Sequence, residues 1–138
     1  MRILCLDIGD KYIGVAVSDA LGITAQGVGT LKRNNNDDDI LEIIKMVQKY
    51  NAEKIIVGLP KNMNGSLGPQ GKKVIEFVDI LKEKIEIPVI EWDERLSTKS
   101  AEKILLEGNV SRKKRKRVID KVAAVFILQN YLDFLRGQ

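Results

Sequence analysis

Apolar residues recur along the first third of the chain with the spacing of β-strands. Residues 2–9 (RILCLDIG) are almost continuously apolar, as in a central strand that is covered on both faces. Residues 13–19 (IGVAVSD) alternate large and small side chains, and residues 23–31 (ITAQGVGTL) are rich in β-formers and glycine. Because short links join these segments, they predict a three-stranded antiparallel meander.

The later part of the chain alternates between helical and strand patterns. A helix is predicted over 34–51, because apolar residues recur there at helical spacing. The acids Asp37–Asp39 near its start favour the positive end of the helix dipole. The remaining segments are predicted as a strand over 54–60, a helix over 69–84, a strand over 88–94, a helix over 97–108 capped by Ser97 or Thr98, and a largely buried helix over about 118–135.

This order of elements predicts an α/β fold in one domain that spans residues 1–138. The sheet should have five strands, antiparallel in the meander and parallel afterwards, with helices against both faces. A chain of 138 residues can bury a core of this kind without disulfide or metal staples. Ligands of such sheets gather at the carboxyl ends of the parallel strands, and Asp7 and the Asp93–Glu94 pair both sit at such ends.

The absence of histidine from the chain excludes several catalytic mechanisms. Ser-His-Asp and Cys-His triads, histidine-ligated zinc and histidine-based nucleases all need a residue that this sequence lacks. The single cysteine, Cys5, lies inside an apolar run and is expected to be a buried hydrophobe in a reducing compartment. No signal-peptide or spanning-helix pattern is present, so a soluble cytoplasmic protein without membrane contact is expected.

Positive charge is concentrated in one run, RKKRKR, which consists of Arg112, Lys113, Lys114, Arg115, Lys116 and Arg117. Without these six residues, 17 of the 23 basic residues remain to face 19 acids, so the net charge of +4 is local to the run. Such a run suits nucleic acid or another polyanion. The alternative is a solvated loop with no binding role.

Three acidic positions are candidates for one site: Asp7, the Asp93–Glu94 pair, and Asp120 near the start of the last helix. Asp120 heads the apolar face formed by Ala123, Ala124, Ile127 and Tyr131. Asp7 and Asp120 also have structural explanations, because Asp before a glycine turn commonly accepts turn amides and Asp at the head of a buried helix is commonly a cap or a salt-bridge partner. The functional case depends on all three together.

Strand parity bears on the choice between Asp93 and Glu94. Ile90, Trp92 and Glu94 share one face of the predicted strand, whereas Glu91 and Asp93 share the other. The sequence does not decide which face meets the last helix. Both acids therefore stand as candidate metal ligands.

Carboxylates that converge need a compensating cation. Two of them about 5 Å apart repel by about 3 kcal/mol at an effective dielectric constant of 20. A set of oxygen ligands favours Mg²⁺ or Mn²⁺ over zinc or copper. Two such ions can activate a water, stabilise a leaving 3′-oxygen and cleave a phosphodiester without histidine.

Four ordered sequence blocks resemble the YqgF/RuvX family of Holliday junction resolvase-like proteins. The blocks are LDIGDKYIGVAVSD (6–19), IIVGLPKNMNGSLGPQG (55–71), DERLST (93–98) and DKVAAVFILQNYL (120–132), and they cover nearly the whole chain. The resemblance implies a ribonuclease H-like fold and a nuclease that processes the 5′ end of precursor 16S ribosomal RNA. It also implies a likeness to RuvC, which cleaves four-way DNA.

The resemblance assigns Asp7 to the first-strand acid position, Glu94 to the DER position and Asp120 to the final-helix position. It implies that Arg95 stabilises the phosphate or orients Glu94. The family usually has arginine just before the IGVA segment, where this chain has Lys11 and Tyr12, so Lys11 is expected to supply a point charge there.

The leading hypothesis is a metal-dependent endonuclease that acts on precursor ribosomal RNA, with four-way DNA as the alternative substrate. A catalytically silent nucleic-acid-binding module is a second hypothesis. A sugar-kinase or actin-like phosphotransferase is a third, but those proteins need two such domains to enclose ATP. A monomer or weak homodimer is expected, because no stretch identifies a dimer interface. The Gly-rich loop 58–73 could offer backbone amides to a phosphate, although turn formation is its ordinary role.

Overall fold

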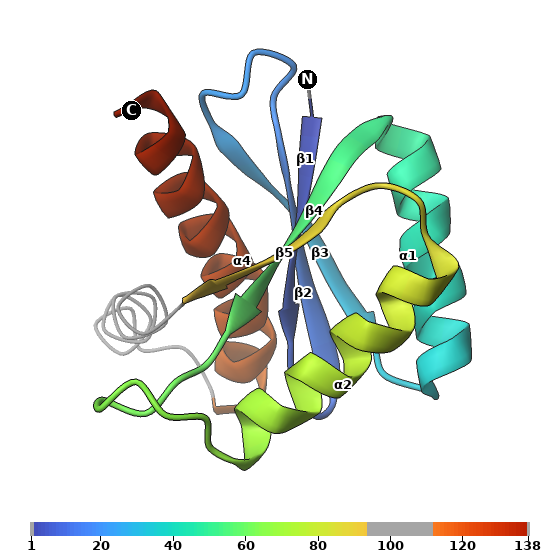
Figure 1. The fold of residues 1–138 in the computed structure, drawn as a ribbon, viewed down its shortest axis with the longest axis vertical. Helices are drawn as coiled ribbons and strands as arrows, with labels where there is room; N and C mark the ends of the chain where they lie inside the picture. The colour runs from blue at the N-terminus through green and yellow to red at the C-terminus, as the bar shows by residue number, and fades with distance from the viewer. Residues whose placement is uncertain (1, 94–111, 138) are drawn as a thin grey trace.

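A five-stranded sheet forms the centre of the molecule (Figure 1). The computed structural model describes residues 2–93 and 112–137. The strands are β1 (Arg2–Ile8), β2 (Tyr12–Ser18), β3 (Ala25–Lys32), β4 (Ala52–Leu59) and β5 (Val89–Asp93). The helices are α1 (Asn36–Tyr50), α2 (Pro69–Lys84) and α4 (Arg112–Arg136).

The strand order β3-β2-β1-β4-β5 places β1 at the middle of the sheet. β1 pairs antiparallel with β2, and β2 pairs antiparallel with β3, which confirms the predicted meander. β1 pairs parallel with β4, and β4 pairs parallel with β5. The predicted mixed sheet is therefore confirmed, and the end of β1 lies among the carboxyl ends of the parallel strands.

Local sequence signals set the ends of α1. The Asn35 side chain accepts a hydrogen bond from the backbone N–H of Asp38 at 2.8 Å, and acids follow in the first turn as predicted. Asn51 ends the helix in the left-handed conformation with φ at 51°.

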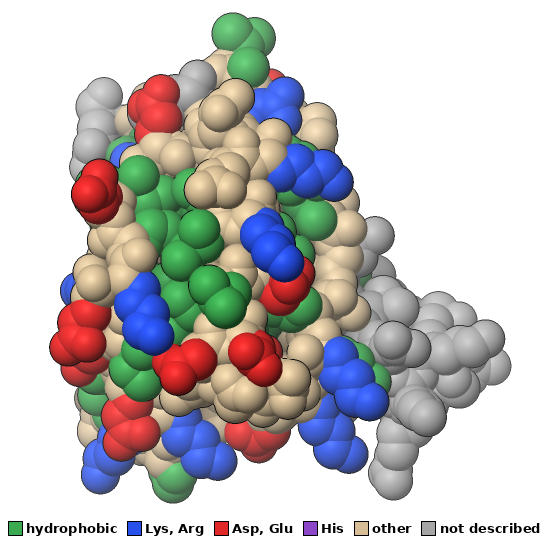
Figure 2. Space-filling model, turned by 90° about the vertical axis from the view of Figure 1, so that its right-hand side faces the viewer, with side chains coloured by type: hydrophobic (Ala, Val, Ile, Leu, Met, Phe, Trp, Pro, Cys, Tyr) green, Lys and Arg blue, Asp and Glu red, His purple; other side chains and the backbone are tan. Residues whose placement is uncertain are grey.

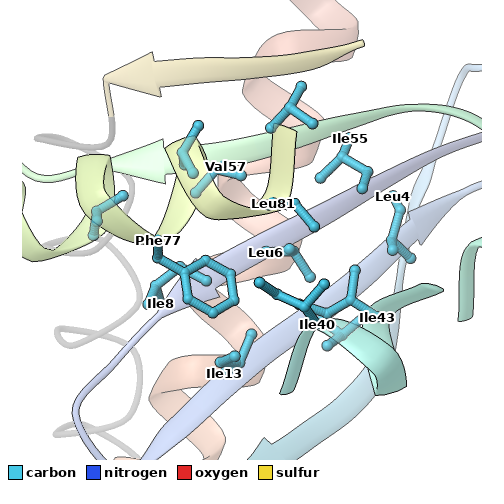
Figure 3. Packing of buried hydrophobic residues seen from close by; sticks show 14 of the residues in the cluster. Leu4, Leu6, Ile8, Ile13, Ile40, Ile43, Ile55, Val57, Phe77 and Leu81 are labelled. Atoms are coloured by element: carbon cyan, nitrogen blue, oxygen red, sulfur yellow. The ribbon is translucent and has the colours of Figure 1, made fainter. Parts of the chain in front are cut away.

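α1 and α2 cover one face of the sheet. Leu4, Leu6 and Ile8 of β1 point into this side, where Phe77 and Leu81 of α2 meet Ile40 and Ile43 of α1 (Figure 3). The outer surface of this layer carries acidic and basic side chains interspersed with one another (Figure 2). This outer face consequently lacks a field of one sign that would attract a polyanion.

α4 covers the opposite face of the sheet. Five of its buried residues pack against Ile3, Cys5 and Ala16; they are Ala124, Ile127, Leu128, Tyr131 and Leu132. The Gln129 side chain joins the helix to β3 by accepting from the Ala25 N–H at 2.9 Å. The helices thus lie on both faces as predicted, and Cys5 is buried as predicted.

The start of α4 differs from the prediction. The helix begins at Arg112, so the backbone of the run 112–117 is helical, whereas the sequence pattern predicts a start at about Val118. Positive charges at a helix start oppose the dipole, but Lys and Arg are good helix formers and can extend a helix that is anchored further along. The predicted helix over 97–108 lies outside the described residues. No helix in the described part of the chain has the length and apolar character needed to cross a bilayer.

Candidate active site

Asp7 is the penultimate residue of β1 and is half-buried. Side chains alternate along a strand, and Ile3 and Cys5 pack against α4 whereas Leu6 and Ile8 belong to the opposite core. Alternation therefore places Asp7 on the α4 face, one step beyond Cys5. This is the position that the sequence predicted for the first acid, at the carboxyl end of the central strand.

The face of β5 that meets α4 is the one that carries Ile90 and Trp92. The ring centroids of Trp92 and Tyr131 are 5.0 Å apart in an edge-on arrangement. Val89 belongs to the opposite core, so alternation places Asp93 on the side of the sheet away from Asp7. The parity question that the sequence left open is answered for the described part of β5.

α4 runs antiparallel to β1, so its first turns lie near the end of the sheet where β1 ends (Figure 1). Position 120 lies one helical turn before Ala123 and Ala124, which are both fully buried. The backbone thus brings the final-helix position toward the end of β1. The Asp120 side chain is outside the described residues.

The remaining predicted residues divide into two groups. Glu94 and Arg95 lie outside the described residues, as do the side chains of Arg112–Arg117. Lys11 is exposed in the turn between β1 and β2, two residues beyond Gly9 and at the same end of the sheet as Asp7. Lys11 can therefore supply a positive charge at the surface beside the proposed site.

The segment between β4 and α2 reaches the same end of the sheet. A turn closed by Asn62 and Ser66 contains Gly65 at φ 87°, and the Gly68 cap has no side-chain hydrogen bond to the helix. The first turn of α2 contains no acid, and Lys73 lies 3.4 Å from Asp10 of the β1–β2 turn. The Gly-rich loop therefore lies beside the end of β1, and its phosphate contact stays a prediction.

Two contacts that sequence reasoning missed hold the backbone just after Asp7. The Gln70 side-chain amide donates to the Ile8 carbonyl at 3.0 Å, and the Arg33 guanidinium donates to the Gly9 carbonyl at 2.9 Å. Both donors border a polar pocket of about 260 Å³ on the α1 and α2 side. No periodicity marks such contacts in a sequence, because a side chain from a distant element meets a backbone carbonyl.

The donor chemistry fits a divalent cation, because each predicted ligand is a carboxylate. Within the described residues, no three acidic, histidine or cysteine groups come close enough together to hold a metal ion. Two members of the predicted trio, Glu94 and Asp120, have side chains outside that part of the chain. Asp7 is the member that the structure describes.

Solved structures share this arrangement over the whole chain. T. thermophilus RuvC in complex with a Holliday junction substrate superposes with a TM-score of 0.61 at 14% identity, covering 100% of this chain and 97% of that chain. Fowlpox virus resolvase in complex with Holliday junction DNA also superposes with a TM-score of 0.61, at 16% identity, covering 98% of this chain and 99% of that chain. The fold is thus the ribonuclease H-like fold of these resolvases.

Sequence comparison defines the family within this fold class. A family model described as "RuvX: Holliday junction resolvase" matches residues 1–134. A Clostridium tetani protein named "Putative pre-16S rRNA nuclease" is 59% identical over 133 residues, which cover 96% of each chain. A Clostridium kluyveri protein of the same name is 58% identical over 133 residues, covering 96% of this chain and 97% of its own. The chain belongs to the RuvX family.

Proposed function

We propose that the protein is an endonuclease that cleaves phosphodiester bonds with Asp7, Glu94 and Asp120 as its acidic centre. The observation that carries this function is the placement of Asp7 at the carboxyl end of β1 on the face covered by α4. Relatives with 56–59% identity carry the name "Putative pre-16S rRNA nuclease", which supports the same reaction class. Retention of the acids argues against a silent binding module.

Glu94 is a better candidate than Asp93 for the second acid. The β5 face that meets α4 carries Ile90 and Trp92, the residues with which Glu94 shares its parity in the sequence. Asp93 falls on the other face together with Val89. Separate Asp93→Asn and Glu94→Gln variants test the choice, and loss of Mn²⁺ binding with Asp93→Asn alone would reverse it.

Mg²⁺ or Mn²⁺ is the cofactor that suits these ligands. When bound, such an ion supplies an activated water and stabilises charge on the cleaved phosphate. The protein's own contribution is positional. β1 presents Asp7 from the rigid centre of the sheet, and the small residues Ala123 and Ala124 let the first part of α4 approach that strand closely.

Precursor 16S ribosomal RNA is the proposed substrate, which would place the reaction in the cytoplasm. The exposed Lys11 and the basic residues 112–117 are proposed to hold the phosphate backbone, and Arg95 to act next to the scissile phosphate. If the basic run contacts four to six phosphates, the log-log salt dependence of RNA binding should have a slope of roughly −3 to −5. A slope near zero would show that the run binds no backbone.

Four-way DNA is the second candidate substrate, and the description of the matching family favours it. Symmetric cleavage of a junction needs a two-fold dimer with two active sites. The two candidate substrates can be distinguished by incubating the protein with a precursor RNA fragment and with a four-way DNA junction in the same Mg²⁺ buffer. The oligomeric state is measured in parallel. Cleavage of the RNA by a monomer supports the RNA substrate, and paired nicks in the junction by a dimer support the DNA substrate.

The Asp7→Asn variant tests the reaction itself. It keeps the size of the side chain and removes its charge, so RNA binding should persist and Mg²⁺-dependent cleavage should be lost. Undiminished cleavage would contradict the assignment. The exposed Asp37, which bonds to Lys84 at 2.9 Å on the other face, provides a matched Asp→Asn control that should cleave normally.

A further inference from the structure

The turn that follows Asp7 is held by side chains from two elements outside the sheet. Gln70 in the first turn of α2 donates its amide to the Ile8 carbonyl at 3.0 Å. Arg33, in the link between β3 and α1, donates to the Gly9 carbonyl at 2.9 Å. The carbonyls of Ile8 and Gly9, the two residues that follow Asp7, are thus both fixed from the side opposite α4.

The sheet itself gives little support to these carbonyls on the β4 side. The paired register of β1 with β4 runs from Arg2 to Leu6 and stops two residues before Ile8. On the β2 side, the Gly9 N–H donates to the Tyr12 carbonyl at 2.9 Å and closes the turn. Gln70 therefore takes the place of a strand neighbour beyond the end of the β1–β4 ladder.

Arg33 is held in one orientation by all of its nitrogen donors. Its Nε donates to the buried carboxylate of Asp39 at 2.8 Å, and its second terminal nitrogen donates to the Asn36 side chain at 3.0 Å. Its guanidinium lies 5.2 Å from the ring centroid of Phe77. Only one-fifth of the Arg33 side chain is exposed. A planar fork with this many fixed contacts defines the position of the Gly9 carbonyl closely.

We propose that Gln70 and Arg33 are positioning residues that fix the direction of the Asp7 carboxylate toward its metal ion. The inference rests on the proposed function, because it assigns Asp7 as a ligand. The side-chain direction of a strand residue follows the backbone on both of its sides, and upstream Asp7 is held by the β1 ladders. Downstream, the β1–β2 pairing continues to Ile8 and the Gly9–Tyr12 bond closes the turn, and Gln70 and Arg33 add the restraint on the Ile8 and Gly9 carbonyls. Mg²⁺ demands near-octahedral geometry, so a small rotation of this backbone weakens binding.

The test uses Gln70→Ala and Gln70→Glu in the full chain. Alanine removes the donor, and glutamate keeps the shape but offers only acceptor oxygens when ionised. Both variants should bind Mn²⁺ about 10-fold more weakly in calorimetric titration, as expected when a residue that orients a metal ligand is lost. In the metal-free protein, the Gly9 amide should exchange with solvent faster than in the wild type. The KM for RNA should stay unchanged while kcat falls.

Gln48→Ala is the matched control. Gln48 is exposed in the last turn of α1, beside the cap that precedes β4, at the end of the sheet where β1 begins. This variant should keep the wild-type Mn²⁺ affinity and the wild-type Gly9 exchange rate. Arg33→Lys should behave like the Gln70 variants, since a single ammonium group cannot reproduce the fork.

Wild-type Mn²⁺ affinity in folded Gln70→Ala and Gln70→Glu would overturn the positioning role while leaving the proposed nuclease in place. Failure of the proposed function has another signature. In that case the wild-type protein would bind no Mn²⁺ at stoichiometric strength and Asp7→Asn would cleave normally, which would overturn both inferences. A 10-fold loss in both Gln70 variants together with normal binding by Gln48→Ala supports the positioning role.

Discussion

Trp92 of β5 meets Tyr131 of α4 edge-on, with their ring centroids 5.0 Å apart. A second aromatic contact joins Trp92 to Phe134 at 5.2 Å. Among the described strands β5 stands at one edge of the sheet, so these rings tie it to the helix across the face where the proposed site lies. The two elements that they connect lead to Glu94 and carry Asp120.

Trp92→Ala should lower the free energy of unfolding by about 2 kcal/mol through lost aromatic packing. Chemical denaturation monitored by far-ultraviolet circular dichroism measures the change. The matched variant is Tyr131→Phe, which keeps the ring and removes only the hydroxyl bonded to Lys54 at 2.9 Å, and it should cost less than about 1 kcal/mol. Equal effects of the two variants would show that the stacking contributes little. Because Trp92 is the only tryptophan in the chain, its fluorescence in the wild type reports this contact directly.

Asp39→Ala should destabilise the protein by roughly 2–4 kcal/mol. The Asp39 side chain is only 2% exposed and accepts from Arg33 at 2.8 Å and from the Asn34 backbone N–H at 3.0 Å. Removal of the carboxylate leaves a mostly buried guanidinium without its counter-charge. Asp37→Ala, which breaks an exposed pair with Lys84, should cost less than about 0.5 kcal/mol in the same denaturation experiment. A small loss for Asp39→Ala would mean that Arg33 finds another acceptor.

Gly71→Ala should destabilise the protein, although alanine normally favours a helix over glycine by about 1 kcal/mol. A Cβ at Gly71 would lie 2.7 Å from the Pro60 carbonyl oxygen and 2.9 Å from a Leu67 methyl carbon, and the carbonyl is backbone that cannot turn aside. We expect a loss of about 1–3 kcal/mol from this overlap. A Cβ at Gly137 would meet nothing closer than 3.5 Å, so Gly137→Ala should be near neutral. A stabilised Gly71→Ala would show that the loop after β4 moves away readily.

Stability should depend on pH through Asp19. The backbone N–H groups of Ile23 and Thr24, at 2.7 and 3.2 Å, hold the pKa of this carboxyl below its ordinary value. A lowered folded-state pKa means that the contribution is complete above the unfolded pKa of about 3.9 and is lost as the pH falls through the folded value. The stability difference between the wild type and Asp19→Ala should therefore shrink in acid. A difference that stays constant down to pH 2 would contradict the role of the charged form.

Strong local signals made most of the fold predictable. The apolar run of β1, the alternation of β2 and the acidic first turn of α1 each act within a few residues, and each formed as expected. The predicted start of α4 was wrong because the charges of 112–117 oppose a helix dipole locally, while the contacts that anchor the helix lie further along the chain.

The candidate site was predictable only as far as strand ends and parity allow. Sequence alone grouped Ile90 with Trp92, but the packing of α4 decides which face of β5 they occupy. The contacts of Gln70 and Arg33 join residues 62 and 24 positions apart. Such contacts depend on the finished fold and leave no pattern in the chain.

The late position of α4 in the chain has a consequence for synthesis. Among the described helices, α4 covers one face of the sheet alone, and every described strand precedes it in sequence. A nascent chain whose α4 has not yet emerged from the ribosome would therefore expose Ile3, Cys5 and Ile56 to water and would lack the final-helix acid. Cleavage by such a nascent chain is impossible if the site is as proposed, so the nuclease would become competent only after its own translation has passed α4.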